Sequence, residues 1–198
     1  MTHQFRLAAL AAIGVALAGC TTVSEQMPQK VIRQHSDVQL SQESVLKFNE
    51  FKSYNFFAAM YVTEEGDGGG RAGGAPTLSD AKRISQSMCE AYNPGDRCIL
   101  LSTVEPADAS KTEELPKHIF DALTRARSRT TEGNYFALAF TPSGQFGTAF
   151  NYSSIGEAKR TALLECETAA ARSRSNDTIT EAKANSKAGS YKCQLYNL

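Results

Sequence analysis

The sequence predicts an α+β fold built from two related modules, each with one or two strands, a helix and a final strand. Two runs rich in aromatic and apolar residues, Phe56 to Thr63 and Tyr135 to Thr141, are typical of buried strands. An amphipathic, alanine-containing segment follows each run, and a cysteine then opens a short apolar stretch. The order of these features is the same in both parts of the chain, which indicates an internal repeat.

Residues 1–19 have the features of a secretory signal peptide. Arg6 precedes an apolar run from Leu7 to Ala18, which is shorter than the about 20 apolar residues that span a bilayer. The run closes on Leu17-Ala18-Gly19-Cys20, which resembles the lipobox of bacterial lipoproteins. This resemblance implies that Cys20 carries the lipid and becomes the first residue of the mature protein. The alternative is an ordinary signal peptide cut nearby, with Cys20 left as a free thiol.

A lipid on Cys20 would hold the mature chain on a membrane. Each buried acyl methylene contributes about 0.8 kcal/mol, so several chains, such as palmitate, anchor a protein stably. Thr21, rather than Asp, follows the cysteine, and by resemblance to Gram-negative sorting this favours the outer membrane. We expect residues 20–40, which are polar up to about Asp37, to be a tether that holds the body in the periplasm.

The first module is expected over residues 41–106. A short helix from Ser41 to Lys52 precedes the first strand, and Glu64 to Pro76 is expected to be a glycine-rich loop. A second helix is predicted to start at Ser79 and to end at an Asn93-Pro94-Gly95-Asp96 turn. The strand that opens at Cys98 completes the module.

The second module is expected over residues 107–198. Its elements are a helix from Pro116 to Arg129, a hairpin around Pro142-Ser143-Gly144-Gln145, and a helix from Ser154 to about Ala171. Ser154 and Glu157 are predicted to form a capping box. Arg172 to Ser190 is expected to be a mobile polar insertion before a last strand at Cys193.

The repeat also predicts how the cysteines pair. With Cys20 assigned to lipid, four remain, and four cysteines allow three pairings in an oxidising compartment. Asn55 to Met60 matches Asn134 to Ala139, and in both copies a cysteine follows eight residues after a helix alanine. The repeat therefore predicts two helix-to-strand bridges, Cys89–Cys98 and Cys166–Cys193. Their closed loops correspond to about 2.5 and 3.5 kcal/mol. A redox-active or metal-binding cysteine set is the alternative, although neither pair has Cys-x-x-Cys spacing.

Composition excludes some function classes and leaves others open. The formal charge is balanced at 21 basic and 21 acidic residues, so we expect no nucleic-acid partner. His35 and His118 are far apart and have no spaced partners, so no metal is expected. Gly68, Gly70 and Gly73 spell G-x-G-x-x-G, the dinucleotide fingerprint. We reject this motif because glycine dominates the segment and Pro76 separates it from the helix, and we expect no cofactor.

Arg125, Arg127 and Arg129 form the one concentrated group of basic residues. They cluster at the end of a predicted helix, where cations interact favourably with the helix dipole. The alternative interpretation is an anion-binding patch for a lipid headgroup or a cell-wall polymer.

The second module resembles a small secreted bacterial domain family of unknown function. The resemblance rests on the strand that starts at Tyr135, the turn glycine Gly144, the alanine-rich helix with Cys166, and the strand led by Cys193. It covers residues 134–198 and extends more loosely to 55–104. It implies no catalytic residues.

These observations predict an outer-membrane lipoprotein that faces the periplasm and has a non-enzymatic role, binding an envelope protein or polymer. An envelope hydrolase or modifying enzyme, with a site that only the fold assembles, is the alternative. A purely structural spacer is the third hypothesis.

Overall fold

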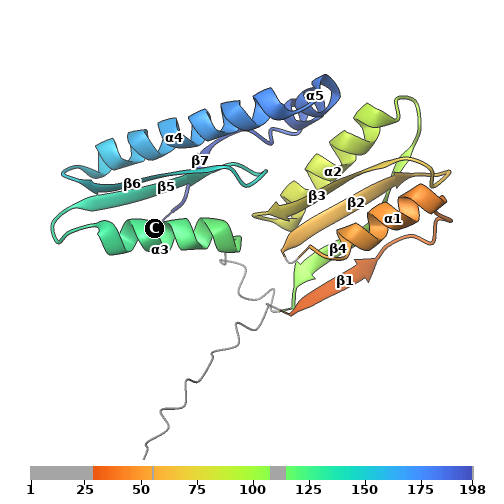
Figure 1. Ribbon diagram of the computed structural model, residues 1–198, viewed down its shortest axis with the longest axis horizontal. Coiled ribbons are helices and arrows are strands. Elements are labelled where there is room, and N and C mark those ends of the chain that lie inside the picture. The colour runs from red at the N-terminus through yellow and green to blue at the C-terminus, as the bar shows by residue number, and fades with distance from the viewer. Residues whose placement is uncertain (1–28, 55, 108–114, 198) are drawn as a thin grey trace, which may run out of the picture.

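The computed structural model describes residues 29–54, 56–107 and 115–197 and has an α+β fold. These residues form five helices and two antiparallel sheets, with strand orders β1-β4-β2-β3 and β6-β5-β7. Figure 1 shows the two sheets next to each other, each between helices. The signal peptide, Cys20 and the lipobox lie outside the described residues.

The first half of the molecule is a four-stranded sheet between two helices. Ala58, Met60 and Val62 pack against Phe51 on the α1 side, and Ala59 packs against Ala81 on the α2 side. This alternation is the two-residue period of a strand that is buried on both faces. The elements are β1 (Lys30–Gln34), α1 (Gln42–Phe51), β2 (Phe57–Thr63), β3 (Gly69–Ala75), α2 (Leu78–Tyr92) and β4 (Cys98–Pro106).

The second half is a three-stranded sheet that also lies between helices. Leu138 and Phe140 pack against Ile119 of α3, whereas Ala137 and Ala139 pack against α4. In Figure 1, α4 and α3 cover opposite faces of this sheet. The elements are α3 (Lys117–Arg129), β5 (Tyr135–Phe140), β6 (Phe146–Tyr152), α4 (Ile155–Asn176), α5 (Ile179–Lys187) and β7 (Gln194–Leu195).

In each half a glycine lets a helix approach the sheet closely. A methyl group at Gly70 would lie 2.3 Å from the backbone nitrogen of Cys89, and one at Gly147 would lie 2.3 Å from that of Cys166. No real side chain tolerates such distances, so glycine is required at both positions. The two glycines are 77 residues apart, as are the two cysteines.

The two predicted disulfides are present. Cys89–Cys98 joins α2 to the start of β4, and Cys166–Cys193 joins α4 to the residue before β7. Cys89 and Cys166 are fully buried, directly opposite the glycines described above. Each bridge therefore fastens the helix at the point where it lies closest to the sheet.

The strands and helices that the sequence predicts are present, but the helix caps differ in part. Ser41 caps α1, with its hydroxyl accepting from the Ser44 N–H at 3.2 Å. The cap of α2 is Thr77 rather than Ser79, because the Thr77 hydroxyl accepts from the Asp80 N–H at 3.0 Å. Ser154 precedes α4 but its side chain makes no capping hydrogen bond, so the predicted box with Glu157 is wrong.

Three segments expected to be irregular are regular. Lys30–Gln34, inside the predicted tether, is strand β1, which pairs with β4. The glycine-rich segment contains β3 and closes a hairpin with β2. Residues 172–190 extend α4 to Asn176 and add α5. β1 and β3 are completed by pairing with β4 and β2, and α5 begins with a capping box of its own.

Helix α5 packs against α2 and so connects the two halves. The ammonium of Lys187 lies 2.9 Å from the carboxylate of Glu90, and this contact lowers the pKa of Glu90. A true capping box begins α5, with Thr178 and Glu181 each accepting from the other's backbone N–H. Tyr191 and Asn185 both donate to the carboxylate of Asp177, which holds the end of the insertion against its beginning.

The glycine contact predicts the effect of adding one methyl group. Gly147→Ala forces a side chain into the α4 backbone, and we expect a loss of about 2 kcal/mol or more in the free energy of unfolding. Gly70→Ala should cost a similar amount. Gly156→Ala is the matched control, because its nearest neighbour would be 3.5 Å away and alanine favours the helix by up to about 1 kcal/mol. Chemical denaturation measures all three, and equal stability of Gly147→Ala and wild type would contradict the account.

Candidate functional site

A groove of about 520 Å³ runs along the free edge of β3. β3 is the last strand of the first sheet, so one of its sides has no neighbouring strand. Helices α1 and α2 border the groove, and α5 contributes one residue. The lining residues come from β2, β3, α1, α2 and α5 and from the turns that follow α1, β2 and α2: Ser44, Lys47, Tyr54, Met60, Asp67, Gly68, Gly69, Gly70, Arg71, Met88, Tyr92, Asn93 and Glu181.

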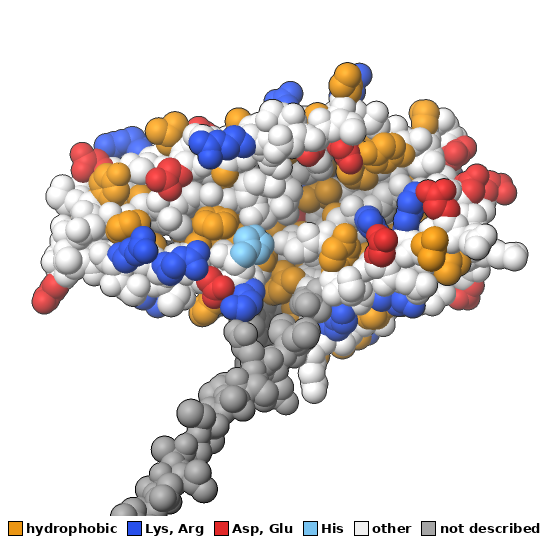
Figure 2. Space-filling model, in the orientation of Figure 1, with side chains coloured by type: hydrophobic (Ala, Val, Ile, Leu, Met, Phe, Trp, Pro, Cys, Tyr) orange, Lys and Arg blue, Asp and Glu red, His pale blue; other side chains and the backbone are white. Residues whose placement is uncertain are grey.

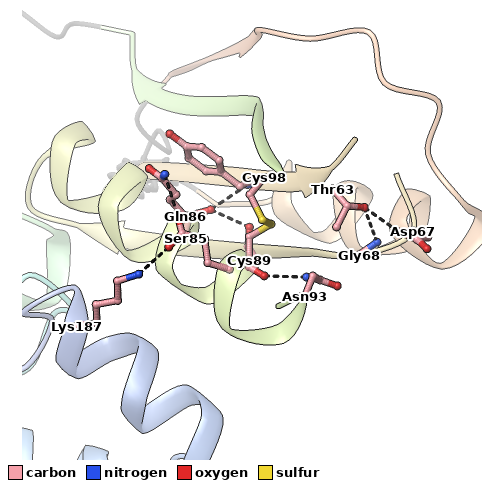
Figure 3. Close-up of a disulfide and its surroundings, with 12 residues drawn as sticks. Thr63, Asp67, Gly68, Ser85, Gln86, Cys89, Asn93, Cys98 and Lys187 are labelled. Atoms are coloured by element: carbon pink, nitrogen blue, oxygen red, sulfur yellow. Dashed lines mark hydrogen bonds and ion pairs between the residues drawn. A yellow bond between two sulfur atoms is a disulfide. The ribbon is translucent and has the colours of Figure 1, made fainter. Parts of the chain in front are cut away.

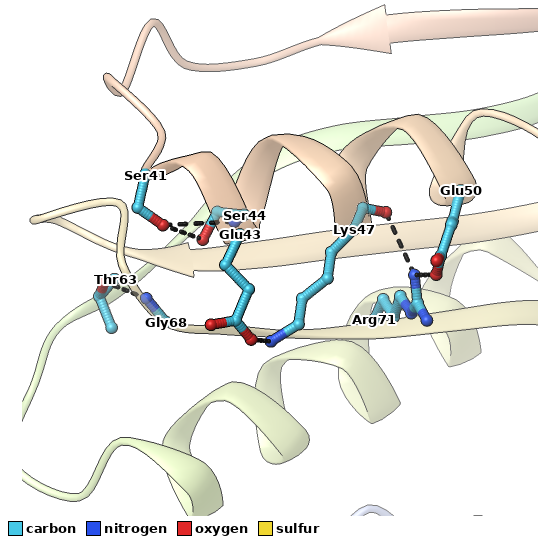
Figure 4. A network of polar contacts seen from close by, with 8 residues as sticks. All are labelled: Ser41, Glu43, Ser44, Lys47, Glu50, Thr63, Gly68 and Arg71. Carbon is cyan, nitrogen blue, oxygen red and sulfur yellow. Dashed lines mark hydrogen bonds and ion pairs between the residues drawn. The ribbon is translucent and has the colours of Figure 1, made fainter.

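The α1 border of the groove carries two ion pairs (Figure 4). Lys47 lies 2.7 Å from Glu43, and this contact lowers the pKa of the Glu43 carboxyl. Arg71 of β3 lies 2.6 Å from Glu50 and also donates to the Lys47 carbonyl at 3.2 Å. Both basic side chains of the groove are therefore held by acidic partners on α1.

One end of the groove is formed by the β2–β3 turn. The Thr63 hydroxyl donates to the Asp67 carboxylate at 2.8 Å and accepts from the Gly68 N–H at 3.2 Å. Asn93 donates to the Cys89 carbonyl at 2.9 Å, so the turn after α2 lies beside this end and next to the disulfide (Figure 3). The turn after α2 is thereby held next to the Cys89–Cys98 bridge.

The α2 border is apolar and continues onto α5. Met88 and Tyr92 line this side, opposite Met60 and Tyr54. Burial, and then the neighbouring carboxylates, raises the pKa of Tyr92. The backbone N–H of Thr178 donates to Glu181 at 2.8 Å and lowers the pKa of that carboxyl, which stays charged at the groove.

A buried serine connects α2 to the hairpin that forms the floor of the groove. The Ser85 hydroxyl accepts from the Tyr61 N–H at 3.1 Å and donates to the Gly70 carbonyl at 2.7 Å. It therefore sits between two backbone groups of the β2–β3 ladder. Ala162 holds the corresponding place on α4, 77 residues later, and has no hydroxyl to do the same.

The three predicted patch arginines lie on α3, but they do not converge on one point. Arg125 and Arg129 line a hollow of about 70 Å³ together with Phe146 and Phe150. The Arg127 guanidinium instead lies 5.6 Å from the centre of the Phe136 ring. Figure 2 shows basic side chains beside hydrophobic ones over α3. Anion binding by these residues stays a prediction.

The glycines of the rejected dinucleotide motif have packing roles. Gly68 precedes β3, and Gly70 and Gly73 lie within it. A side chain at Gly68 would collide with Asn93, and one at Gly73 would lie 2.7 Å from the Tyr54 ring. The spacing of these glycines thus follows from close contacts of the edge strand.

Two further findings concern the residues that the structure describes. No group of three His, Cys, Asp or Glu side chains among them is arranged to hold a metal ion. None of the helices in the described ranges is both long and apolar enough to cross a bilayer.

A comparison with protein-family models matches none of them, and no curated protein or solved structure matches the chain. The resemblance of residues 134–198 to a secreted domain family stays a prediction.

The anchor of α5 predicts a change in stability at high pH. Burial, and then the hydrogen bond to Asp177, raises the pKa of Tyr191 to about 12. The pKa of a tyrosine in the unfolded chain is about 10. The stability that the Tyr191 anchor contributes is therefore complete below pH 10 and is lost as the pH rises toward 12. We expect the stability of wild type to fall more steeply over this range than that of Tyr191→Phe. Thermal unfolding of both proteins measures the difference, and parallel curves would refute the anchor.

Proposed function

We propose that the chain is a lipid-anchored protein of the bacterial outer membrane, facing the periplasm, with a non-enzymatic role in binding an envelope partner. The observation that carries this proposal is the pair of disulfides. Each closes between a fully buried cysteine on a helix and a cysteine at the start of a strand, or just before one, in the same half. Such bridges form in oxidising compartments, and the Leu17-to-Cys20 sequence supplies a route to one.

The groove beside β3 supports binding rather than hydrolysis. Its basic groups, Lys47 and Arg71, are engaged by acidic residues of α1. Asp67 accepts from the Thr63 hydroxyl, and Glu181 accepts from the Thr178 N–H. Each charged side chain therefore has a structural partner, which favours a preformed recognition surface.

We also propose that the two halves are copies of one module. The support is the shared strand order, with the hairpin's first strand in the middle, and the shared contact at Gly70 and Gly147. Gly70 pairs with Tyr61 of β2, and Gly147 pairs with Ala139 of β5. Ala59 and Ala137, each two residues before that partner, therefore occupy equivalent positions in the two ladders. This register is one residue away from the sequence match of Ala58 with Ala137. A slip of one residue reverses the face of every side chain in a strand.

Lipidation at Cys20 can be tested by metabolic labelling in a Gram-negative host. The wild-type chain should incorporate labelled palmitate and should fractionate with the outer membrane, and Cys20→Ala should incorporate none. The matched control is the Cys89→Ala/Cys98→Ala double variant, which lacks two other cysteines and should keep the label. Label retained by Cys20→Ala would contradict the proposed anchor.

A further inference from the structure

The free edge of β3 offers backbone groups to a partner. The Thr63 N–H donates to the Gly68 carbonyl at 3.1 Å, so this pair is hydrogen-bonded within the hairpin. Because hydrogen-bonded pairs alternate along an antiparallel ladder, the backbone groups of Gly70 and Ala72 face β2 as those of Gly68 do. The N–H and carbonyl groups of Gly69, Arg71 and Gly73 therefore face away from β2, and no described residue bonds to them.

Little protects this edge. Proteins normally guard an edge strand with charged side chains, proline or a covering element. At Gly69, Gly70 and Gly73 there is no side chain, and Gly73 is exposed. The one long side chain, that of Arg71, is bound to Glu50 and the Lys47 carbonyl on α1 (Figure 4). Backbone groups of the edge thus line an open groove.

The borders of the groove match the alternation of an extended chain. Side chains of an added strand would point in turn toward α1, where Met60 and Tyr54 lie, and toward α2, where Met88 and Tyr92 lie. Methionine is flexible and adapts to different apolar partners. The two borders can therefore accept varied side chains while the backbone supplies the binding register.

Charge indicates one feature of the partner. Lys47 and Arg71 are neutralised by Glu43 and Glu50, whereas Asp67 and Glu181 have no ion-pair partner among the described residues. The lowered pKa of Glu181 keeps that carboxyl ionised. The turn end of the groove is consequently acidic and complements a basic side chain.

We propose that this groove binds an extended polypeptide segment, which pairs with the β3 edge as an added strand and places a basic side chain near Asp67 and Glu181. This mode of recognition draws affinity from main-chain hydrogen bonds and specificity from alternate side chains. The proposal rests on the proposed binding function and gives the chemical class of its partner. Its failure would leave the lipid anchor untouched, because the palmitate experiment tests the anchor separately.

The test selects peptides from a phage-displayed library of random 12-residue sequences against the full chain in detergent. The best peptide is synthesised, and its Kd is measured for wild type, Arg71→Ala and Arg71→Pro. Both variants lose the ion pair with Glu50, but only proline removes the outward N–H. We expect Arg71→Ala to bind within about threefold of wild type and Arg71→Pro to bind at least about tenfold more weakly. Equal binding by the two variants, or a library that yields no binder, would overturn the proposal.

Amide hydrogen exchange provides a measurement that does not depend on the folding of the proline variant. In wild type the amides of Gly69, Arg71 and Gly73 should exchange rapidly and should become protected when the selected peptide binds. Binding without protection of these amides would overturn strand addition. Protection that rises with protein concentration in the absence of peptide would assign the edge to a second copy of the chain and would equally overturn the proposal.

The charge preference has its own conservative variants. Asp67→Asn and Glu181→Gln keep hydrogen-bonding oxygens, and glutamine preserves a capping box. The double variant should select peptides without the basic residue that wild type prefers. Unchanged enrichment of lysine and arginine would refute the charge element of the proposal.

Discussion

The approach of one helix to the backbone of each sheet is the constraint on which this structure depends. Gly70 and Gly147 let α2 and α4 lie closer to a strand than any side chain would permit. The cysteine on each helix is buried at that point. Its disulfide partner lies at the start of β4 in the first half and just before β7 in the second. Close packing brings many atoms into dispersion contact, and the disulfide limits the freedom of the unfolded chain. A side chain at either glycine would separate the layers that the bridge joins.

The groove is a consequence of the same contact. β3 must carry glycine where α2 passes, and further glycines make room for Asn93 and Tyr54. A strand with so few side chains has a bare edge, and that edge becomes the floor of the groove. Helix α5 then completes the site, because its capping residue Glu181 lies at the groove while Lys187 fastens the same helix to α2. The stability of the first half and its candidate recognition surface thus share the same residues.

Sequence patterns predicted the parts of the fold that local chemistry determines. The aromatic strands, the turn at Gly144, the helix that Ser41 caps and both cysteine pairs lie where they were expected. β1 and β3 were missed because each strand depends on a pairing partner, whereas α5 was missed although Thr178 and Glu181 form a local capping box. Lys30–Gln34 has only two apolar residues, Val31 and Ile32, and becomes a strand by pairing with β4, and β3 consists mainly of a residue with low strand propensity. Polar contacts hold α5 in place, since Lys187 pairs with Glu90 and Asn185 donates to Asp177, so the helix needs no apolar stripe.

The candidate groove could not be read from the sequence, since its residues come from five elements and form no motif. The available signal was the glycine run after a strand, which is typical of a close backbone approach.

Peptide mapping under non-reducing conditions tests the central constraint most directly, because trypsin cleaves after Arg97, Arg160 and Lys192 and so separates the four cysteines. The account predicts disulfide-linked peptides that join Cys89 to Cys98 and Cys166 to Cys193. A bridge between Cys89 or Cys98 and either of the other two would contradict it.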